Sequence, residues 1–188
     1  MVKSCGVDVT VDGSEQIEEG RTYILMANHQ GAFDIFALLA YLPVDFKWVA
    51  REEIFRIPII GWAMRAAGYI SIDRRGRKKA IQSIEKAVAK IREGTSVLVF
   101  PEGTRSPDGR IHDFKKGGFT LAVKAGVPVL PISIRGSREV LPRGSLRVKG
   151  GRIRIIVGQP IRTDQRGPAA RQALMGEVRQ AIEEGFRG

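Results

Sequence analysis

The chain has 188 residues, of which 43% are hydrophobic and 27% charged, so it is long enough to bury a core and fits a single globular domain. Its formal net charge of +11 favours anionic partners, and its single cysteine excludes an internal disulfide. Because the chain holds only two histidines besides that cysteine, we expect no His/Cys metal site and no bound cofactor.

The first clear elements are an apolar run and an apolar helix, separated by a polar turn. The pattern predicts a buried strand over residues 22–27 and a helix over residues 35–42. His29 and Asp34 lie in the turn. Positions five apart on a regular helix point about 140° apart, so these two side chains cannot meet on one helix. We therefore place His29 at the end of the strand and Asp34 at the start of the helix.

Helical periodicity predicts three further helices. One covers residues 77–93 and another residues 119–125, and each is followed by a glycine that ends it. In the last helix Pro168 occupies the first turn, and an apolar residue recurs every four positions from Leu174 to Ile182. Strands are predicted over residues 95–99, 127–134 and 153–157. This alternation predicts an α/β fold: one domain with a central mixed, largely parallel sheet surrounded by helices.

His29 and Asp34 are the residue types of a general base with its orienting partner. Histidine exchanges a proton near neutral pH, and a carboxylate on its second ring nitrogen fixes the tautomer and stabilises the imidazolium. The pair would activate a hydroxyl or a thiol. A structural histidine beside an ordinary helix-capping aspartate is the alternative for this motif taken alone.

A second polar cluster follows the strand predicted over residues 95–99. Glu102, Gly103, Thr104 and Arg105 place a carboxylate, a permissive glycine, a hydroxyl and a guanidinium side by side. Arginine offers a planar fork of donors that suits a phosphate, and glycine lets the backbone approach a ligand. The cluster therefore predicts a phosphate site, with a surface turn held by a salt bridge as the alternative.

These segments resemble the motifs of the glycerolipid acyltransferases. Residues 28–34 (NHQGAFD) resemble the family's NHxxxxD signature, and residues 100–106 (FPEGTRS) resemble its FPEGTRS block. Two weaker blocks follow in the expected order, at residues 68–74 and 127–132. The resemblance covers residues 5 to 165 and implies the same kind of fold, with the motifs on loops at one edge of a central sheet.

The resemblance also implies a reaction and a set of roles. An acyl chain would move from an acyl thioester to the sn-2 hydroxyl of 1-acyl-glycerol-3-phosphate, giving phosphatidic acid. His29 would deprotonate the hydroxyl and Asp34 would orient His29. Backbone N–H groups near residues 129–132 would stabilise the oxyanion. Residues 102–105 would hold the acceptor, chiefly through Arg105. Further positive charge in the same pocket would come from Arg51, Arg74 and Lys115.

The co-substrate implied is acyl-CoA or an acylated acyl carrier protein, and the sequence does not choose between them. A different acceptor, such as glycerol-3-phosphate or a lyso-aminolipid, is one alternative function. A non-catalytic basic module that binds phospholipid or nucleic acid is another, although binding alone has no need of a histidine base.

The expected location is peripheral, at the cytoplasmic face of a membrane. No stretch reaches the roughly 18 apolar residues of a spanning helix, and we expect this chain to lack the N-terminal membrane helix of many family members. Residues 57–72, with Trp62 and Tyr69, are the best membrane-contact candidate, unless they form core or line an acyl tunnel. Residues 135–166 hold nine Lys or Arg against two acids and no aromatic residue. That composition favours an anionic membrane surface, and we expect no nucleic acid.

Overall fold

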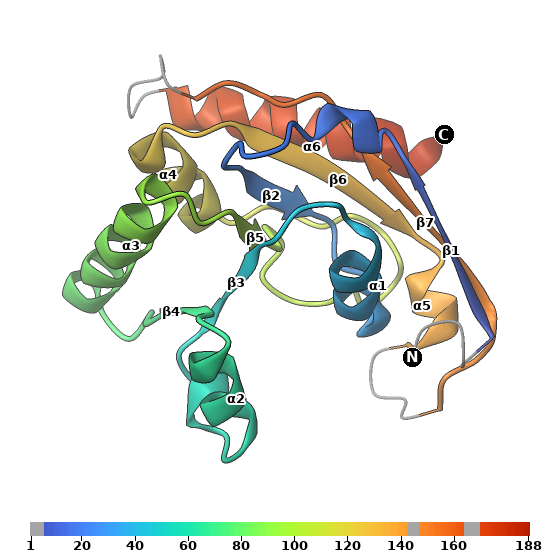
Figure 1. The fold of residues 1–188 in the computed structure, drawn as a ribbon, viewed down its shortest axis with the longest axis horizontal. Helices are drawn as coiled ribbons and strands as arrows, with labels where there is room; N and C mark the ends of the chain where they lie inside the picture. The colour runs from blue at the N-terminus through green and yellow to red at the C-terminus, as the bar shows by residue number, and fades with distance from the viewer. Residues whose placement is uncertain (1–5, 143–146, 164–169) are drawn as a thin grey trace.

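A computed structural model describes residues 6–142, 147–163 and 170–188. The strands are β1 (Val7–Asp12), β2 (Ile24–Ala27), β3 (Lys47–Arg51), β4 (Ile70–Ile72), β5 (Val97–Val99), β6 (Val129–Arg135) and β7 (Gly151–Val157). They form one sheet in the order β1-β7-β6-β2-β5-β3-β4 (Figure 1). Neighbouring strands are parallel except β6 and β7. The predicted α/β class with a mixed, largely parallel sheet is confirmed.

The helices pack on both faces of this sheet. They are α1 (Phe33–Tyr41), α2 (Ile60–Ala66), α3 (Arg77–Arg92), α4 (Lys116–Ala125), α5 (Ser137–Val140) and α6 (Arg171–Arg187), with short 3-10 turns η2 (Ser14–Gln16) and η3 (Ile54–Arg56). One core cluster contains buried residues of α1 and α5, and the other contains those of α3, α4 and α6. The molecule is therefore a three-layer α/β/α fold.

Strand β2 shows why the central strands of the sheet have continuous apolar sequences. Side chains alternate between the two faces of a strand. Leu25 and Ala27 join the cluster with α1, whereas Ile24 and Met26 join the cluster with α3, α4 and α6. Because helices cover both faces, all four residues of β2 are buried.

The parallel arrangement brings the two polar motifs to the same edge. β2 lies beside β5, with Met26 opposite Val99. His29 follows the end of β2, and Phe100 follows the end of β5. Because the carboxyl ends of neighbouring parallel strands meet at one edge of a sheet, the histidine motif and the FPEGTRS segment lie side by side there.

The structure corrects several predicted boundaries. α1 begins at Phe33 rather than at residue 35, and Asp34 lies in its first turn, at the start of the helix as predicted. α4 begins three residues before its predicted start at 119, because the glycine pair at its N-terminus continues the helix despite a low helix propensity. The predicted position of Pro168 lies outside the described residues.

A projection stands out from the body of the molecule between β3 and β4 (Figure 1). It consists of η3 and α2, and residues 54–66 are called the 54–66 projection below. Only part of the predicted membrane-contact segment belongs to it, since residues 70–72 form β4, an edge strand of the sheet. Tyr69 is half-buried and stacks on Trp48, with ring centroids 5.1 Å apart. Within the described residues, none of the helices combines the length and apolar composition that crossing a bilayer requires.

Candidate active site

His29 and Asp34 form the predicted pair. Nδ1 of His29 lies 2.7 Å from Oδ2 of Asp34, whose side chain is fully buried. The same oxygen accepts hydrogen bonds from the backbone N–H groups of Gln30, at 2.7 Å, and Gly31, at 3.0 Å. An ionised carboxylate on Nδ1 holds the proton on that nitrogen. Nε2 of His29 is then left with a free lone pair, as a general base requires.

Two neighbours of the pair fix the turn that joins them. At Gly31 a Cβ atom would lie 2.5 Å from the carbonyl oxygen of Ser137, so a side chain at this position would clash with the backbone after β6. The amide of Asn28 donates to the carbonyl oxygen of Ile134 and accepts from its N–H, at 2.9 and 2.7 Å. The turn is thereby tied to β6. The sequence placed both residues in the motif but assigned them no role.

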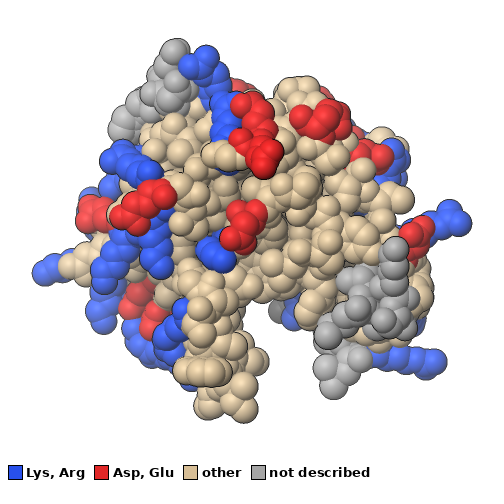
Figure 2. All heavy atoms as spheres, viewed as in Figure 1, with Lys and Arg blue, Asp and Glu red and all other residues tan. Residues whose placement is uncertain are grey.

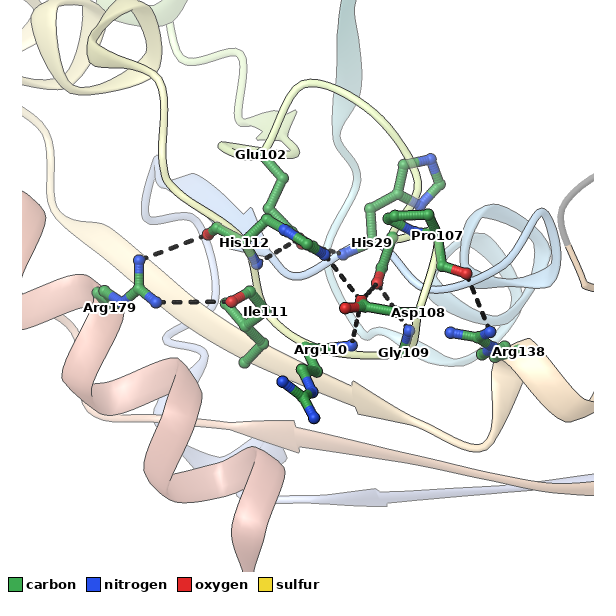
Figure 3. A network of polar contacts seen from close by, with 11 residues as sticks. His29, Glu102, Pro107, Asp108, Gly109, Arg110, Ile111, His112, Arg138 and Arg179 are labelled. Carbon is green, nitrogen blue, oxygen red and sulfur yellow. Dashed lines mark hydrogen bonds and ion pairs between the residues drawn. The ribbon is translucent and has the colours of Figure 1, made fainter.

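The carboxylate of Glu102 accepts hydrogen bonds from two backbone N–H groups of the site. Its Oε1 accepts the N–H of His29 at 2.8 Å, and its Oε2 accepts the N–H of His112 at 2.9 Å (Figure 3). The residue is buried, and burial raises the pKa of its carboxyl while the two backbone hydrogen bonds oppose that rise. Glu102 does not line the cleft. It is a positioning residue for His29, which corrects its predicted role in holding the acceptor.

We expect Glu102→Gln to destabilise the protein, and Glu102→Ala to destabilise it more. Both carboxylate oxygens face N–H donors, so a glutamine must turn its own NH₂ group toward one of them. One buried donor then loses its acceptor, which costs about 1–3 kcal/mol, and alanine abandons both donors. Urea unfolding of the two variants measures this, with Glu139→Gln on α5 as the control. Wild-type stability in Glu102→Gln would remove Glu102 as the acceptor of these hydrogen bonds.

The loop that contains Glu102 is fastened at several points (Figure 3). The N–H of Ser106 donates to the carbonyl oxygen of His29 at 2.8 Å. Asp108 accepts from the N–H of Arg110 and contacts Nε2 of His112 at 2.8 Å, and these bonds hold the pKa of its carboxyl well below the usual range. Arg138 donates to the carbonyl oxygen of Pro107 at 3.0 Å. The loop therefore presents its polar groups in a fixed arrangement.

Phe100 contacts the ring of His29 directly. Its side chain stacks on His29 with ring centroids 3.9 Å apart and an angle of 13° between the planes. Such stacking holds the imidazole in one orientation without using either nitrogen. The only sequence signal for Phe100 is its place in the FPEGTRS segment, because an aromatic residue after a strand ordinarily belongs to the core.

A cleft of about 940 Å³ opens beside His29. Six of the predicted binding residues line it: Arg51, Arg74, Gly103, Thr104, Arg105 and Lys115. Nη2 of Arg51 donates to the carbonyl oxygen of Gly103 at 2.8 Å, and a Cβ atom at Gly103 would lie 3.8 Å from Nη1 of Arg74. These six residues form the basic wall of the cleft.

The basic wall holds more positive charge than its neighbours neutralise. The pKa of Arg74 is lowered, first by burial and then by the positive charge of Arg51. Two guanidinium groups that repel each other favour an anion between or beside them. The N-terminus of α4, where Lys115 is the capping residue, adds the positive end of a helix dipole to the same wall.

The other walls of the cleft are apolar. Side chains from β3, β4, β5, α3, α4 and the 54–66 projection line them, among them Val49, Ile54, Met64, Ile72, Ile84 and Leu121. An alkyl chain gains free energy by leaving water for such a surface, at about 25 cal/mol per Å² of apolar area buried. Among the described residues, no group of three or more His, Cys, Asp or Glu is placed to hold a metal ion.

The segment expected to stabilise the oxyanion is buried in the sheet. Residues 129–132 belong to β6, which lies between β2 and β7. The N–H of Val129 donates to the carbonyl oxygen of Ile161, and position 131 is a proline without an N–H. This segment therefore does not provide donors to the cleft, which corrects the prediction.

The sheet, the histidine–aspartate pair at its edge and the cleft with one basic and several apolar walls define the class: an α/β fold with a candidate active site at the carboxyl edge of its sheet. The family model described as Acyltransferase matches residues 8–135. The chain belongs to this family.

Individual relatives share most of this chain. A chloroplastic 1-acyl-sn-glycerol-3-phosphate acyltransferase of Arabidopsis thaliana is 38% identical over 94% of this chain and 48% of its own length. One of Pseudomonas aeruginosa is 32% identical over 95% of this chain and 67% of its own. The chain thus spans about half the length of the chloroplastic relative.

A solved structure has a similar fold. The crystal structure of the 1-acyl-sn-glycerophosphate (LPA) acyltransferase PlsC from Thermotoga maritima matches with a TM-score of 0.81 and 34% identity. The match covers 95% of this chain and 70% of that one.

Proposed function

We propose that this protein transfers an acyl chain from an acyl thioester to the sn-2 hydroxyl of 1-acyl-glycerol-3-phosphate, giving phosphatidic acid. The proposal rests on one observation above all: His29, the basic wall and the apolar walls share a single cleft. The activity for which the relatives from Arabidopsis thaliana and Pseudomonas aeruginosa are named supports the same substrate.

In the proposed reaction, Nε2 of His29 removes the proton from the acceptor hydroxyl as its oxygen attacks the thioester carbonyl. A tetrahedral intermediate forms, and its collapse breaks the carbon–sulfur bond. The imidazolium then returns the proton to the departing thiolate. Asp34 stabilises the imidazolium throughout, and base catalysis of this kind contributes about 10²–10⁴-fold in rate.

The basic wall binds the phosphate of the acceptor in this proposal. Arg105 lines the cleft together with His29, and Arg51, Arg74 and Lys115 surround Gly103 on the same wall. A phosphate held there fixes the glycerol backbone, so that one hydroxyl is presented to His29. Holding two reactants in this way contributes as much as the proton transfer itself.

The apolar walls receive the alkyl chains. The thioester comes from acyl-CoA or an acylated acyl carrier protein, and the steps above use no other cofactor. Because both the acceptor and the product are membrane lipids, the proposed site of action is peripheral, at the cytoplasmic face of a membrane. The excess of basic over acidic residues in the chain suits an anionic surface of that kind.

Arg105→Ala is expected to raise the KM for 1-acyl-glycerol-3-phosphate about 30-fold, because a charge-assisted hydrogen bond contributes about 2 kcal/mol. The KM for monoacylglycerol, which lacks the phosphate, should not change. Steady-state kinetics with both acceptors measures the difference. Arg110→Ala is the matched control, since Arg110 is exposed on the same loop and does not line the cleft. An unchanged KM for the phosphorylated acceptor in Arg105→Ala would place the phosphate elsewhere.

A further inference from the structure

The 54–66 projection carries an unusual number of exposed apolar side chains. Ile59 is 81% exposed and Trp62 is 74% exposed, and Ile54, Ile57 and Ile60 are also exposed. Figure 2 shows this part of the molecule as a largely tan prominence at the bottom of the view. Large apolar groups gathered on one prominence mark a surface that binds a partner.

The projection is a packed unit and presents these side chains in a fixed arrangement. Phe55 is buried, and Nη2 of Arg65 donates to its carbonyl oxygen at 2.6 Å. At Gly61 a Cβ atom would lie 2.0 Å from the same carbonyl oxygen. This close approach of α2 to η3 therefore requires glycine, and it holds the tip outward.

The tip also contains a strained residue. Ile59 has a φ of 67°, and it is the only non-glycine residue of the described ranges with a positive φ. A β-branched residue is disfavoured in this region of backbone space. An isoleucine therefore occupies a position that glycine would occupy with less strain. Its side chain is nevertheless almost wholly exposed to solvent.

One side of the projection faces the cleft. Ile54, Ile60 and Met64 line the cleft, whereas Ile57, Ile59 and Trp62 do not. The apolar surface of the tip is therefore continuous with the apolar walls beside His29. A lipid chain that leaves an apolar phase at the tip can reach the site without crossing water.

Basic side chains lie next to the projection. β4 follows α2 directly, and the start of α3 after it holds the exposed residues Arg77, Lys78 and Lys79. Arg74 lines the cleft just before them. In Figure 2, Lys and Arg side chains gather on the flank beside the tan prominence. An apolar tip flanked by cations matches the interface of an anionic bilayer, where each nearby Lys or Arg strengthens binding about fivefold.

We propose that the 54–66 projection inserts its apolar tip into the interface of an anionic lipid bilayer and so opens the cleft toward the membrane. Ile57, Ile59 and Trp62 enter the acyl–headgroup boundary, and the basic start of α3 contacts the headgroups. The docking itself stands apart from the reaction. The transfer of lipid from bilayer to cleft rests on the proposed function.

Binding to vesicles tests the docking. The whole chain is mixed with vesicles of equal parts phosphatidylcholine and phosphatidylglycerol, and the bound fraction is measured by flotation. Ile59→Gly and Trp62→Ser together should weaken binding by at least about tenfold. Val148→Ser is the control, because Val148 is an exposed apolar residue just before β7, at the other end of the sheet from β4. Vesicles of phosphatidylcholine alone should bind wild-type protein more weakly.

The variants are chosen to keep the fold. Glycine adopts the backbone conformation of residue 59 without strain, so Ile59→Gly should have an unchanged or higher Tm. Quenching of Trp62 fluorescence by brominated lipid, compared with Trp62→Phe, gives a second measure of insertion. Wild-type vesicle binding in the double variant, or no quenching of Trp62, would overturn the proposal. A wild-type dimer that Trp62→Ser converts to a monomer would assign the tip to a second copy instead.

Kinetics separate this proposal from the proposed function. The double variant should lose kcat/KM toward 1-acyl-glycerol-3-phosphate embedded in vesicles by about the same factor as it loses binding. It should keep kcat/KM toward a short-chain, water-soluble analogue. Equal losses on both substrates would contradict entry from the bilayer. Absence of acyl transfer with either substrate would reject the proposed function, while vesicle binding would still decide the docking.

Discussion

His29→Ala is expected to lower kcat by about 10³-fold or more while leaving the affinity for 1-acyl-glycerol-3-phosphate nearly unchanged. The substitution removes the proposed base that takes the hydroxyl proton, which is worth about 10²–10⁴-fold, and also the group that returns it to the thiolate. The proposed phosphate ligands Arg51, Arg74 and Arg105 do not depend on the imidazole. Single-turnover rates and acceptor titrations measure the two effects separately.

His112 provides the matched control for that variant. Its ring contacts Asp108 and is about half exposed, while its backbone N–H donates a hydrogen bond to Glu102. His112→Ala removes the ring and leaves that backbone bond in place, so kcat should stay within about threefold of wild type. A similar fall in kcat for both variants would indicate a structural effect. Near wild-type turnover in His29→Ala would reject His29 as the base.

The second large effect is expected for Asp34→Asn, which should lower kcat by about 10²–10⁴-fold. An asparagine oxygen in place of Oδ2 still accepts from Nδ1 of His29 and from the two backbone N–H groups. The negative charge is lost, however, so the imidazolium of the transition state loses its counter-ion. Single-turnover rates at saturating acceptor measure this loss directly.

Asp34→Ala separates catalysis from stability. Alanine leaves the N–H groups of Gln30 and Gly31 without their acceptor in a buried turn, at a cost of about 2–5 kcal/mol. Asparagine keeps that acceptor, and its NH₂ replaces Oδ1, which has no hydrogen-bond partner among the described residues. Asp34→Asn should therefore unfold at a higher urea concentration than Asp34→Ala. Wild-type kcat in Asp34→Asn would show that the carboxylate charge is not needed.

The sequence predicted the His29–Asp34 pair because its determinants are local. A strand, a turn with glycine and a helix start suffice to bring His29 and Asp34 together across five positions. The convergence of Arg51, Arg74 and Lys115 on Gly103 is not local, since it depends on β3, β4 and β5 lying side by side. The family resemblance supplied those three residues, and composition alone would have left them as solvated charges.

The predicted role of Glu102 in holding the acceptor was wrong, and the reason is physical. A carboxylate in a polar loop is equally suited to a ligand and to a backbone N–H group. Its partner, the N–H of His29, is 73 positions away in the chain, and no local pattern indicates that contact.

The 54–66 projection was only partly predicted for a similar reason. Residues 57–72 form one apolar stretch, and their division between a solvent-exposed tip and a buried strand is set by the position of β4 in the sheet.

The most direct measurement is product analysis with an isotopically labelled acyl thioester, 1-acyl-glycerol-3-phosphate and purified protein on anionic vesicles. Mass spectrometry should find phosphatidic acid with the label at the sn-2 position, formed by wild-type protein and not by His29→Ala. Release of the label only as free fatty acid, or phosphatidic acid formed equally by both proteins, would contradict acyl transfer by the His29–Asp34 pair.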